Sequence, residues 1–152
     1  MTCATIMSLH PKALKESDTI GHATQEMVAQ NSVTLPVVDS DGRLVGLFGI
    51  QDLLALLVPR VAVIGNLLPN LRFLSEDMGQ LHSKFKALCD SPVQRAVNRE
   101  AARVHPDSSL VEAIRLFCLN HTIIPVVERG SGVLVGLISS SDAAKLIAQT
   151  SI

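Results

Sequence analysis

The feature that most constrains this chain is a stretch that occurs twice. Residues 36–52 contain Pro-Val-Val, a polar turn with a glycine, Leu-Val-Gly-Leu and, five positions on, an aspartate, and residues 125–142 contain the same series. The central glycine and the final aspartate both recur after 90 positions, as Gly46 with Gly136 and Asp52 with Asp142 (136 − 46 and 142 − 52). A long internal repeat predicts two equivalent structural units.

Both copies predict the same order of elements: an extended stretch, an amphipathic helix, a strand, a polar turn, a second strand and a closing helix. In the first copy these are expected at 14, 18–31, 33–38, 40–42, 43–48 and 49–57, and in the second at 104, 109–118, 123–127, 128–132, 133–139 and from 139 onward. The second copy's first helix has a capping-box spacing from Ser109 to Glu112. Its expected apolar stripe is Leu110, Ala113, Ile114, Phe117 and Cys118.

The sequence divides into a first repeat at 1–58, an insert at 59–92 and a second repeat at 93–152. Within the insert, Ser75 can cap a helix that ends before Ser91-Pro92. One face of this helix carries Met78, Leu81, Phe85 and Leu88. We expect the helix to pack on the core, and contact with a partner is the second possibility.

Composition argues against several classes of protein. A hydrophobic content of 47% with 18% charged residues is ample for a core and argues against disorder. The 13 basic and 14 acidic residues leave no basic footprint for nucleic acid. The longest apolar run, Leu53 to Leu68, is interrupted by Pro59 and Arg60, so membrane insertion is not expected.

The cysteines and histidines predict neither a disulfide framework nor a metal site. There are three cysteines without a CxxC pair, and the N-terminus lacks a signal-peptide h-region, so a reducing, cytoplasmic location is expected. Cys118 and His121 have a metal-compatible spacing but no second pair, and Cys118 lies on the expected apolar stripe. No nucleophile, base and orienting group emerge as a set, and we expect no enzyme and no cofactor.

The repeated order of elements, with Pro-Val-Val, Val-Gly-Leu and the helix-opening aspartate in one register, resembles the CBS (cystathionine β-synthase) domain. Two tandem copies resemble a CBS pair, or Bateman module, over nearly all of the chain except about 59–92. The resemblance implies an α+β fold of two β-α-β-β-α repeats packed about a pseudo-twofold axis, with an inserted helical linker. It also implies a homodimer and clefts between the copies that bind adenosine nucleotides.

The best candidate for a ligand site is the Gly136–Asp142 segment. It resembles the family's Gly-apolar-apolar-Thr/Ser-x-x-Asp motif, in which the hydroxyl, here Ser139, meets phosphate or ribose and the Asp, here Asp142, accepts from ribose hydroxyls. A helix N-terminus also favours an anion. The same two residues form an ordinary helix cap worth about 1 kcal/mol, and the two interpretations are compatible.

The first copy departs from this motif, because Gly49 stands where the hydroxyl residue is expected, while Asp52 is kept. A hydrogen bond to a charged group is worth roughly 1.5–3 kcal/mol. We therefore predict unequal clefts, with the cleft of Ser139 and Asp142 the better binder.

The family resemblance implies that the base lies between the first strand and the residues before the proline. By register these are Val104, His121, Thr122 and Ile123 in the second copy and Leu14, Ser32 and Val33 in the first. Val104 and Ile123 equally fit a plain core, and His121 fits a helix-end interaction with the last carbonyls. Arg99 and Arg103 fit either a phosphate contact or a solvated face.

Two functions follow as hypotheses. In the first, AMP, ADP or ATP, with S-adenosylmethionine a weaker option, binds between the copies, shifts their orientation and so signals to a separate regulated protein. In the second, the clefts stay empty and the apolar helices serve dimerisation and partner docking.

Overall fold

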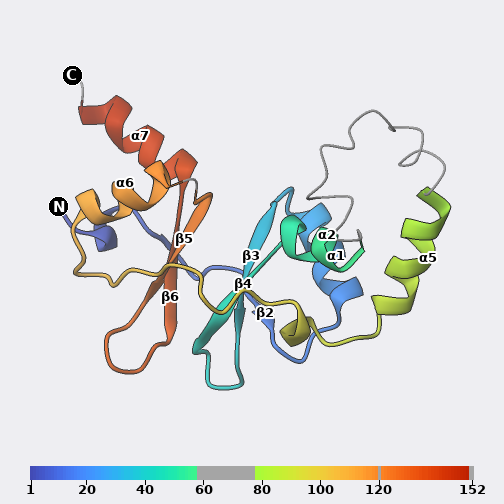
Figure 1. The fold of residues 1–152 in the computed structure, drawn as a ribbon. Helices are drawn as coiled ribbons and strands as arrows, with labels where there is room; N and C mark the ends of the chain where they lie inside the picture. The colour runs from blue at the N-terminus through green and yellow to red at the C-terminus, as the bar shows by residue number, and fades with distance from the viewer. Residues whose placement is uncertain (58–77, 120, 151–152) are drawn as a thin grey trace.

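The fold is described from a computed structural model, which covers residues 1–57, 78–119 and 121–150. It is an α+β fold with two three-stranded sheets side by side at its centre (Figure 1). The first sheet has the order β2 (Leu14–Lys15), β3 (Thr34–Val38) and β4 (Leu44–Gly49), and the second has the order β1 (Ser8–Leu9), β6 (Leu134–Ser139) and β5 (Ile123–Val127). The predicted fold class is confirmed.

Helices cover the outer side of each sheet (Figure 1). The first repeat carries α1 (Ile20–Ala29) and α2 (Ile50–Leu57), and the second carries α6 (Leu110–Cys118) and α7 (Ser140–Thr150). Thr19 and Ser109 cap α1 and α6, as each side-chain oxygen accepts a backbone amide three residues on. The capping box read from the sequence therefore places the start of α6 correctly, and of the two possible caps in the first copy, Asp18 and Thr19, the structure uses Thr19.

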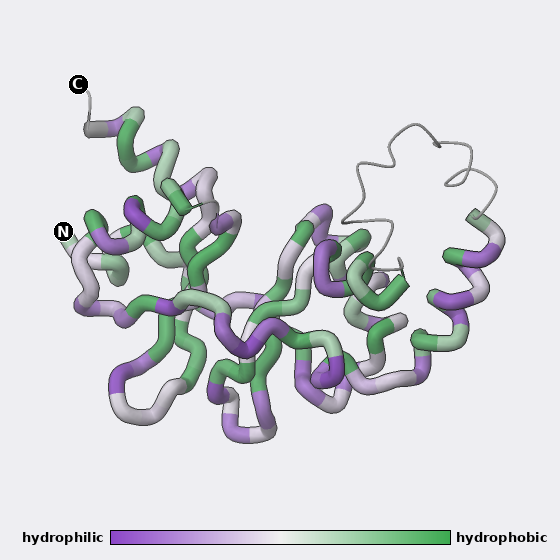
Figure 2. The backbone as a smooth tube through the Cα atoms, in the orientation of Figure 1, coloured by the Kyte–Doolittle hydropathy of each residue, from purple (hydrophilic) through white to green (hydrophobic). Residues whose placement is uncertain are grey.

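The two hairpins are so alike that they share the same irregularity in strand pairing. In β3–β4 the pairing shifts between Val37 and Val38, and in β5–β6 it shifts between Val126 and Val127. Gly42 and Gly132 in the two turns have φ values of +80° and +74°, which an L side chain rarely adopts. Along the tube in Figure 2 the β5–β6 strands are mainly hydrophobic, and their turn is purple on one side and nearly white elsewhere.

The N-terminal segments of the two repeats are exchanged. β1 pairs with β6 of the second repeat, and the corresponding residue of the second repeat, Asn98, pairs with Leu47 in β4 of the first. Cys3 is fully buried in the second repeat's core, and Val93 is fully buried in the first repeat's core. Each repeat therefore contributes its first segment to the sheet and core of the other. The ranges 1–58 and 93–152 are units of sequence, but they do not pack separately.

The insert contributes α5 (Met78–Leu88), while residues 59–77, with the proposed cap Ser75, lie outside the described residues. Leu81, Phe85 and Leu88 pack against the first repeat's core, as the apolar face predicts, whereas Met78 is exposed. α5 lies beside α1 and α2, at the end of the molecule far from the second repeat (Figure 1).

One expected face is rotated. In α6 the buried residues are Leu110, Ala113 and Leu116, while Ile114 and Cys118, expected on the apolar stripe, are exposed. The stripe prediction is wrong in these positions because the sheet contacts one narrow face of the helix, and apolar residues beside that face remain in solvent.

Candidate functional site: two clefts between the repeats

Two clefts lie between the repeats, and each is lined by residues of both. The Asp142 cleft, of about 440 Å³, contains Ser139, Asp142 and Lys145 from the second repeat with Lys12 and Ser32 from the first. The Asp52 cleft, of about 350 Å³, contains Gly49 and Asp52 from the first repeat with His121 and Thr122 from the second. Thr34 and Ile123 line both clefts. Both volumes lie in the range of small-molecule sites, roughly 300–1,000 Å³.

In the Asp142 cleft, Ser139 and Asp142 form a reciprocal cap at the start of α7. The Ser139 amide donates to Asp142 Oδ2 at 2.9 Å, and the Asp142 amide donates to Ser139 Oγ at 3.1 Å. The Ser139 hydroxyl has accepted one bond and can still donate its own hydrogen. The second Asp142 carboxylate oxygen can still accept. The cap and the ligand-binding capacity are therefore compatible, as the sequence suggests.

The first amides of α7 also matter for an anion. The Ser140 amide donates to the Thr122 carbonyl at 3.3 Å, and the Asp142 amide is held by Ser139. Ser141, which lies between them, lines the cleft. An amide at the positive end of an 11-residue helix is a natural donor to a phosphate oxygen.

The Asp52 cleft keeps only half of the cap. The Gly49 amide donates to Asp52 Oδ2 at 2.8 Å, but Gly49 has no side chain to return a bond. A Cβ at Gly49 would lie 2.9 Å from Thr34 Oγ1 and 3.1 Å from the Val33 carbonyl oxygen. Glycine is therefore favoured here by crowding, because a Cβ at position 49 would force the Thr34 hydroxyl to shift.

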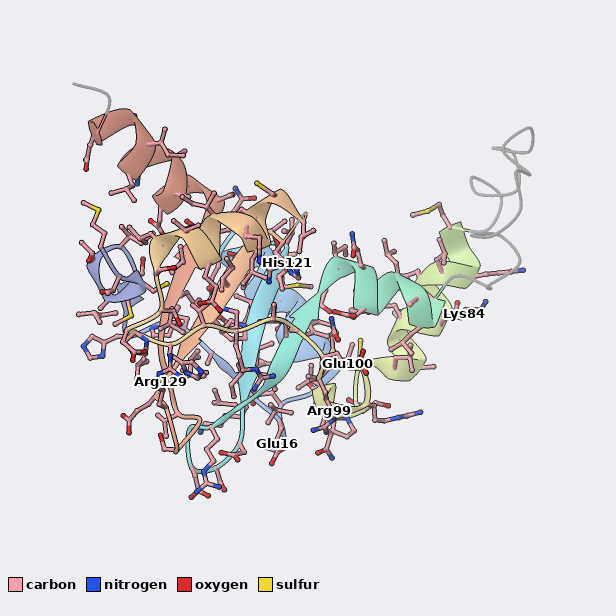
Figure 3. All side chains as sticks on the ribbon, turned by 60° about the vertical axis from the view of Figure 1, so that its left-hand side comes forward. Glu16, Lys84, Arg99, Glu100, His121 and Arg129 are labelled. Atoms are coloured by element: carbon pink, nitrogen blue, oxygen red, sulfur yellow. The ribbon has the colours of Figure 1, made fainter. Side chains whose placement is uncertain are left out.

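Burial shifts the pKa of the Asp52 carboxyl. Desolvation raises the pKa of the Asp52 carboxyl above its ordinary value, and the hydrogen bond from the Gly49 amide offsets part of that rise. Among the described residues, no lysine or arginine lines this cleft. His121 lines the same cleft from the second repeat, near the end of α6 (Figure 3).

The structure divides the remaining sequence candidates between cleft and core. Val33, His121, Thr122 and Ile123 line the Asp52 cleft, and Ile123 also lines the Asp142 cleft. His121, Thr122 and Ile123 of the second repeat therefore share a cleft with Asp52 of the first repeat. The register within one copy instead places His121 and Thr122 in the same site as Asp142. Leu14 and Val104, 3% and 1% exposed, are core residues that line neither cleft.

Several cleft residues carry no motif in the sequence, and two arginines that fit a phosphate contact by sequence lie elsewhere. Lys12, Gln30 and Lys145 line the Asp142 cleft without belonging to any motif. The signal that could have found Lys145 is its position three residues after Asp142, on the same helix face. Arg99 and Arg103 line neither cleft, and Arg99 is exposed on the segment that precedes α6 (Figure 3).

Other kinds of site find no support in the described residues. No group of three or more metal-ligating side chains is found in 1–57, 78–119 and 121–150. Within those same ranges no helix has both the length and the apolar character needed to cross a membrane.

Comparison with known proteins gives one family and a consistent fold. The family model described as CBS domain matches residues 3–59 and again residues 93–149. A search of curated protein sequences gave no match. The chain is similar to the crystal structure of CBSX2 in complex with AMP, with a TM-score of 0.72 and 21% identity over 99% of this chain and 98% of that one.

Two further solved structures have the same fold. The CBS-pair protein CBSX2 from Arabidopsis thaliana has a TM-score of 0.77 and 23% identity, covering 99% of this chain and 96% of that one. A hypothetical conserved protein from Geobacillus kaustophilus has a TM-score of 0.76 and 19% identity, covering 99% of this chain and 98% of that one.

Proposed function

The chain belongs to the CBS domain family and carries the domain twice, and from this premise we propose that it is a regulatory module, not an enzyme, that binds an adenosine nucleotide between its repeats. The observation that carries the proposal is the Asp142 cleft, which joins a hydroxyl, a carboxylate and a helix N-terminus in one cleft of about 440 Å³. The AMP complex of a protein with the same fold supports an adenosine ligand.

Each group in the cleft has a chemical use toward a nucleotide. The Asp142 carboxylate accepts from the cis-diol of the ribose, and the Ser139 hydroxyl and Ser141 amide donate to phosphate. Ile123, Leu137 and the buried Leu35 supply apolar surface for the base. The ligand is AMP, ADP or ATP, with S-adenosylmethionine a weaker option.

Regulation follows from the way the cleft is built. A ligand in it contacts both repeats, so it binds more tightly to one relative orientation of the repeats and shifts the population toward that orientation. The changed surface is then read by a separate, regulated protein.

The three cysteines are all free thiols, which supports the expected cytoplasmic location.

The proposed assembly is a homodimer. Val111 and Leu119 on the helical side of the second repeat are 73% and 58% exposed, and Ile114 beside them is 38% exposed. An apolar group of this kind is more stable when covered. Sedimentation equilibrium tests this directly, and a mass of one chain at all concentrations would contradict it.

The second candidate function is a structural and dimerisation module whose clefts stay empty. Two features of the Asp52 cleft favour it. Gly49 stands in place of the hydroxyl residue, and none of the described residues that line the cleft is a lysine or an arginine. The two functions differ in one measurable property, which is whether any adenosine ligand stabilises the folded chain.

Thermal unfolding with adenosine, AMP, ADP, ATP and S-adenosylmethionine distinguishes them. A bound ligand at 100 times its Kd stabilises the fold by about 2.7 kcal/mol. We expect Asp142→Ala to abolish most of this ligand-induced shift, and Asp52→Ala to reduce it less. Asp142→Asn, which retains an acceptor oxygen, separates loss of the ligand contact from loss of the helix cap.

The matched control is Asp41→Ala, which removes an exposed carboxylate in the β3–β4 turn. It should leave the ligand-induced shift unchanged. No shift with any of the five ligands would support the structural module, and equal losses in Asp142→Ala and Asp52→Ala would refute the prediction of unequal clefts.

A further inference from the structure

Two lysines line the Asp142 cleft from different repeats. Lys12 lies on the crossover that joins β1 to β2, and Lys145 lies on α7, three residues after Asp142. Both side chains are largely exposed, and with Asp142 they give the wall of this cleft two cationic groups and one anionic group.

The other cleft lacks both cations. The positions 90 residues from Lys12 and Lys145 are Ala102 and Ala55 (12 + 90 and 145 − 90). Neither alanine lines the Asp52 cleft, whose described charged residue is Asp52 itself. The charge difference between the clefts is therefore a property of this sequence and does not follow from the repeated motif.

From this asymmetry we infer that Lys12 and Lys145 bind the phosphate chain and make the Asp142 cleft selective for nucleoside polyphosphates over the monophosphate and the nucleoside. The inference rests on the proposed function, since it concerns the same cleft and names the ligand class it prefers. Ser139 and the Ser141 amide suffice for one phosphate at the start of α7. Further phosphates add negative charge, and among the described residues that line this cleft the two ammonium groups are the ones that can neutralise it.

The position of the lysines also gives the longer ligand a distinct effect. Lys12 lies on the crossover from β1, which pairs in the second sheet, to β2, which pairs in the first, and Lys145 lies on α7. A phosphate chain that contacts both therefore connects α7 to the crossover between the two sheets. A ligand without those phosphates still contacts both repeats in the cleft but lacks this additional connection. ATP therefore favours the bridged orientation of the repeats more strongly than AMP does, because only ATP has the additional contacts.

The size of the effect follows from the exposure of the lysines. Exposed ion pairs contribute up to about fivefold each to an equilibrium constant. Together the two lysines should strengthen ATP binding relative to adenosine by about tenfold at low ionic strength. This gain should shrink in high salt, because the Debye length falls from about 10 Å at 0.1 M to about 3 Å at 1 M.

The test measures dissociation constants for adenosine, AMP, ADP and ATP by calorimetry on the full chain. It is done in an Asp52→Ala background, so that the Asp142 cleft dominates the signal. The variants are Lys12→Ala/Lys145→Ala and the charge-retaining Lys12→Arg/Lys145→Arg. The control is Lys84→Ala/Lys86→Ala, which removes the same charge from exposed positions of α5, where Lys84 lies far from both clefts (Figure 3).

The expected result is that affinity rises from adenosine to AMP to ATP in the background chain and in the control. The alanine pair should bind adenosine unchanged and lose about tenfold in ATP affinity, and the arginine pair should retain the ATP preference. The inference is overturned if the alanine pair keeps the full preference for ATP, or if the control loses it equally. If neither adenosine nor any nucleotide binds, the proposed function fails and the inference fails with it.

Discussion

The starts of α2 and α7 are the same structure with different chemistry. In both, the residue before the helix donates its amide to an aspartate three positions on, at 2.8 Å from Gly49 and 2.9 Å from Ser139. Register pairs Gly49 with Thr34 on the neighbouring strand and Ser139 with Ile123. In the first repeat the hydroxyl therefore lies on β3, at Thr34, whereas in the second it lies at the end of β6, at Ser139. The backbone arrangement at the helix start is the same in both, because the aspartate alone accepts the bond from the amide.

A second difference concerns what covers the helices. In the first repeat α5 packs on α1 and α2 through Leu81, Phe85 and Leu88. Within the described residues α6 and α7 have no such covering helix, and Val111 on α6 is 73% exposed. The repeats therefore share a fold but present different outer surfaces, and we expect them to differ in the partners they contact.

The largest expected difference between the repeats lies where the exchanged segments cross the sheets. A Cβ at Gly46 would collide with the Asn98 carbonyl oxygen, which is backbone, whereas a Cβ at Gly136 would meet the flexible Met7 side chain, with Sδ at 2.8 Å. We expect Gly46→Ala to lower the free energy of unfolding by about 3 kcal/mol and Gly136→Ala by about 1 kcal/mol. Urea denaturation measures both, and equal losses would contradict the assigned difference in rigidity.

The next effect concerns the displaced hydroxyl. Gly49→Ser should destabilise the fold by about 1–2 kcal/mol, because its Cβ lies 2.9 Å from Thr34 Oγ1. Adding Thr34→Ala should recover about half of that loss, a coupling that a double-mutant cycle measures. In the second repeat the reverse change, Ser139→Gly, should cost only a few tenths of a kcal/mol. Additive effects of Gly49→Ser and Thr34→Ala would show that the two side chains do not compete for space.

The smallest effect is a dependence on pH. Because burial raises the pKa of Asp52 in the folded chain, the folded state binds more protons than the unfolded state between the ordinary and the raised pKa. Stability due to this group therefore decreases as pH rises through that interval. Asp52→Asn should be more stable than the parent at pH 7, and this advantage should disappear in acid below the ordinary carboxyl pKa.

Asp107 provides a control of opposite sign. Its hydrogen bond and charge interaction with Arg129, with Nε–Oδ1 at 2.8 Å, lower the pKa of this exposed carboxyl. The stabilisation is present above the ordinary pKa and is lost as pH falls through the lowered one, so Asp107→Asn should be slightly less stable than the parent at pH 7. Denaturation curves between pH 3 and pH 7 compare both variants, and two differences of the same sign would contradict the assignment.

Much of the fold was readable because its signals are local. The caps at Thr19 and Ser109, the turn glycines and the β5 strand depend on residues within a few positions of one another. The rotated face of α6 was not readable in the same way, since Leu116 and Ile114 are equally apolar and only contact with the sheet distinguishes them. The candidate site was readable at Ser139 and Asp142, whose motif is contiguous, and not at Lys12, which reaches the cleft only through the crossover.

By itself the sequence determined that this protein has two like halves, where their helices and hairpins begin, and which half keeps a hydroxyl before its aspartate. Only the tertiary structure decided that the halves exchange their first segments, that His121 and Thr122 line the cleft of Asp52, and that Thr34 crowds position 49. The physical reason is distance along the chain. Caps and turns arise from neighbours a few residues apart, whereas a contact such as Leu47 with Asn98 forms only when the whole chain packs.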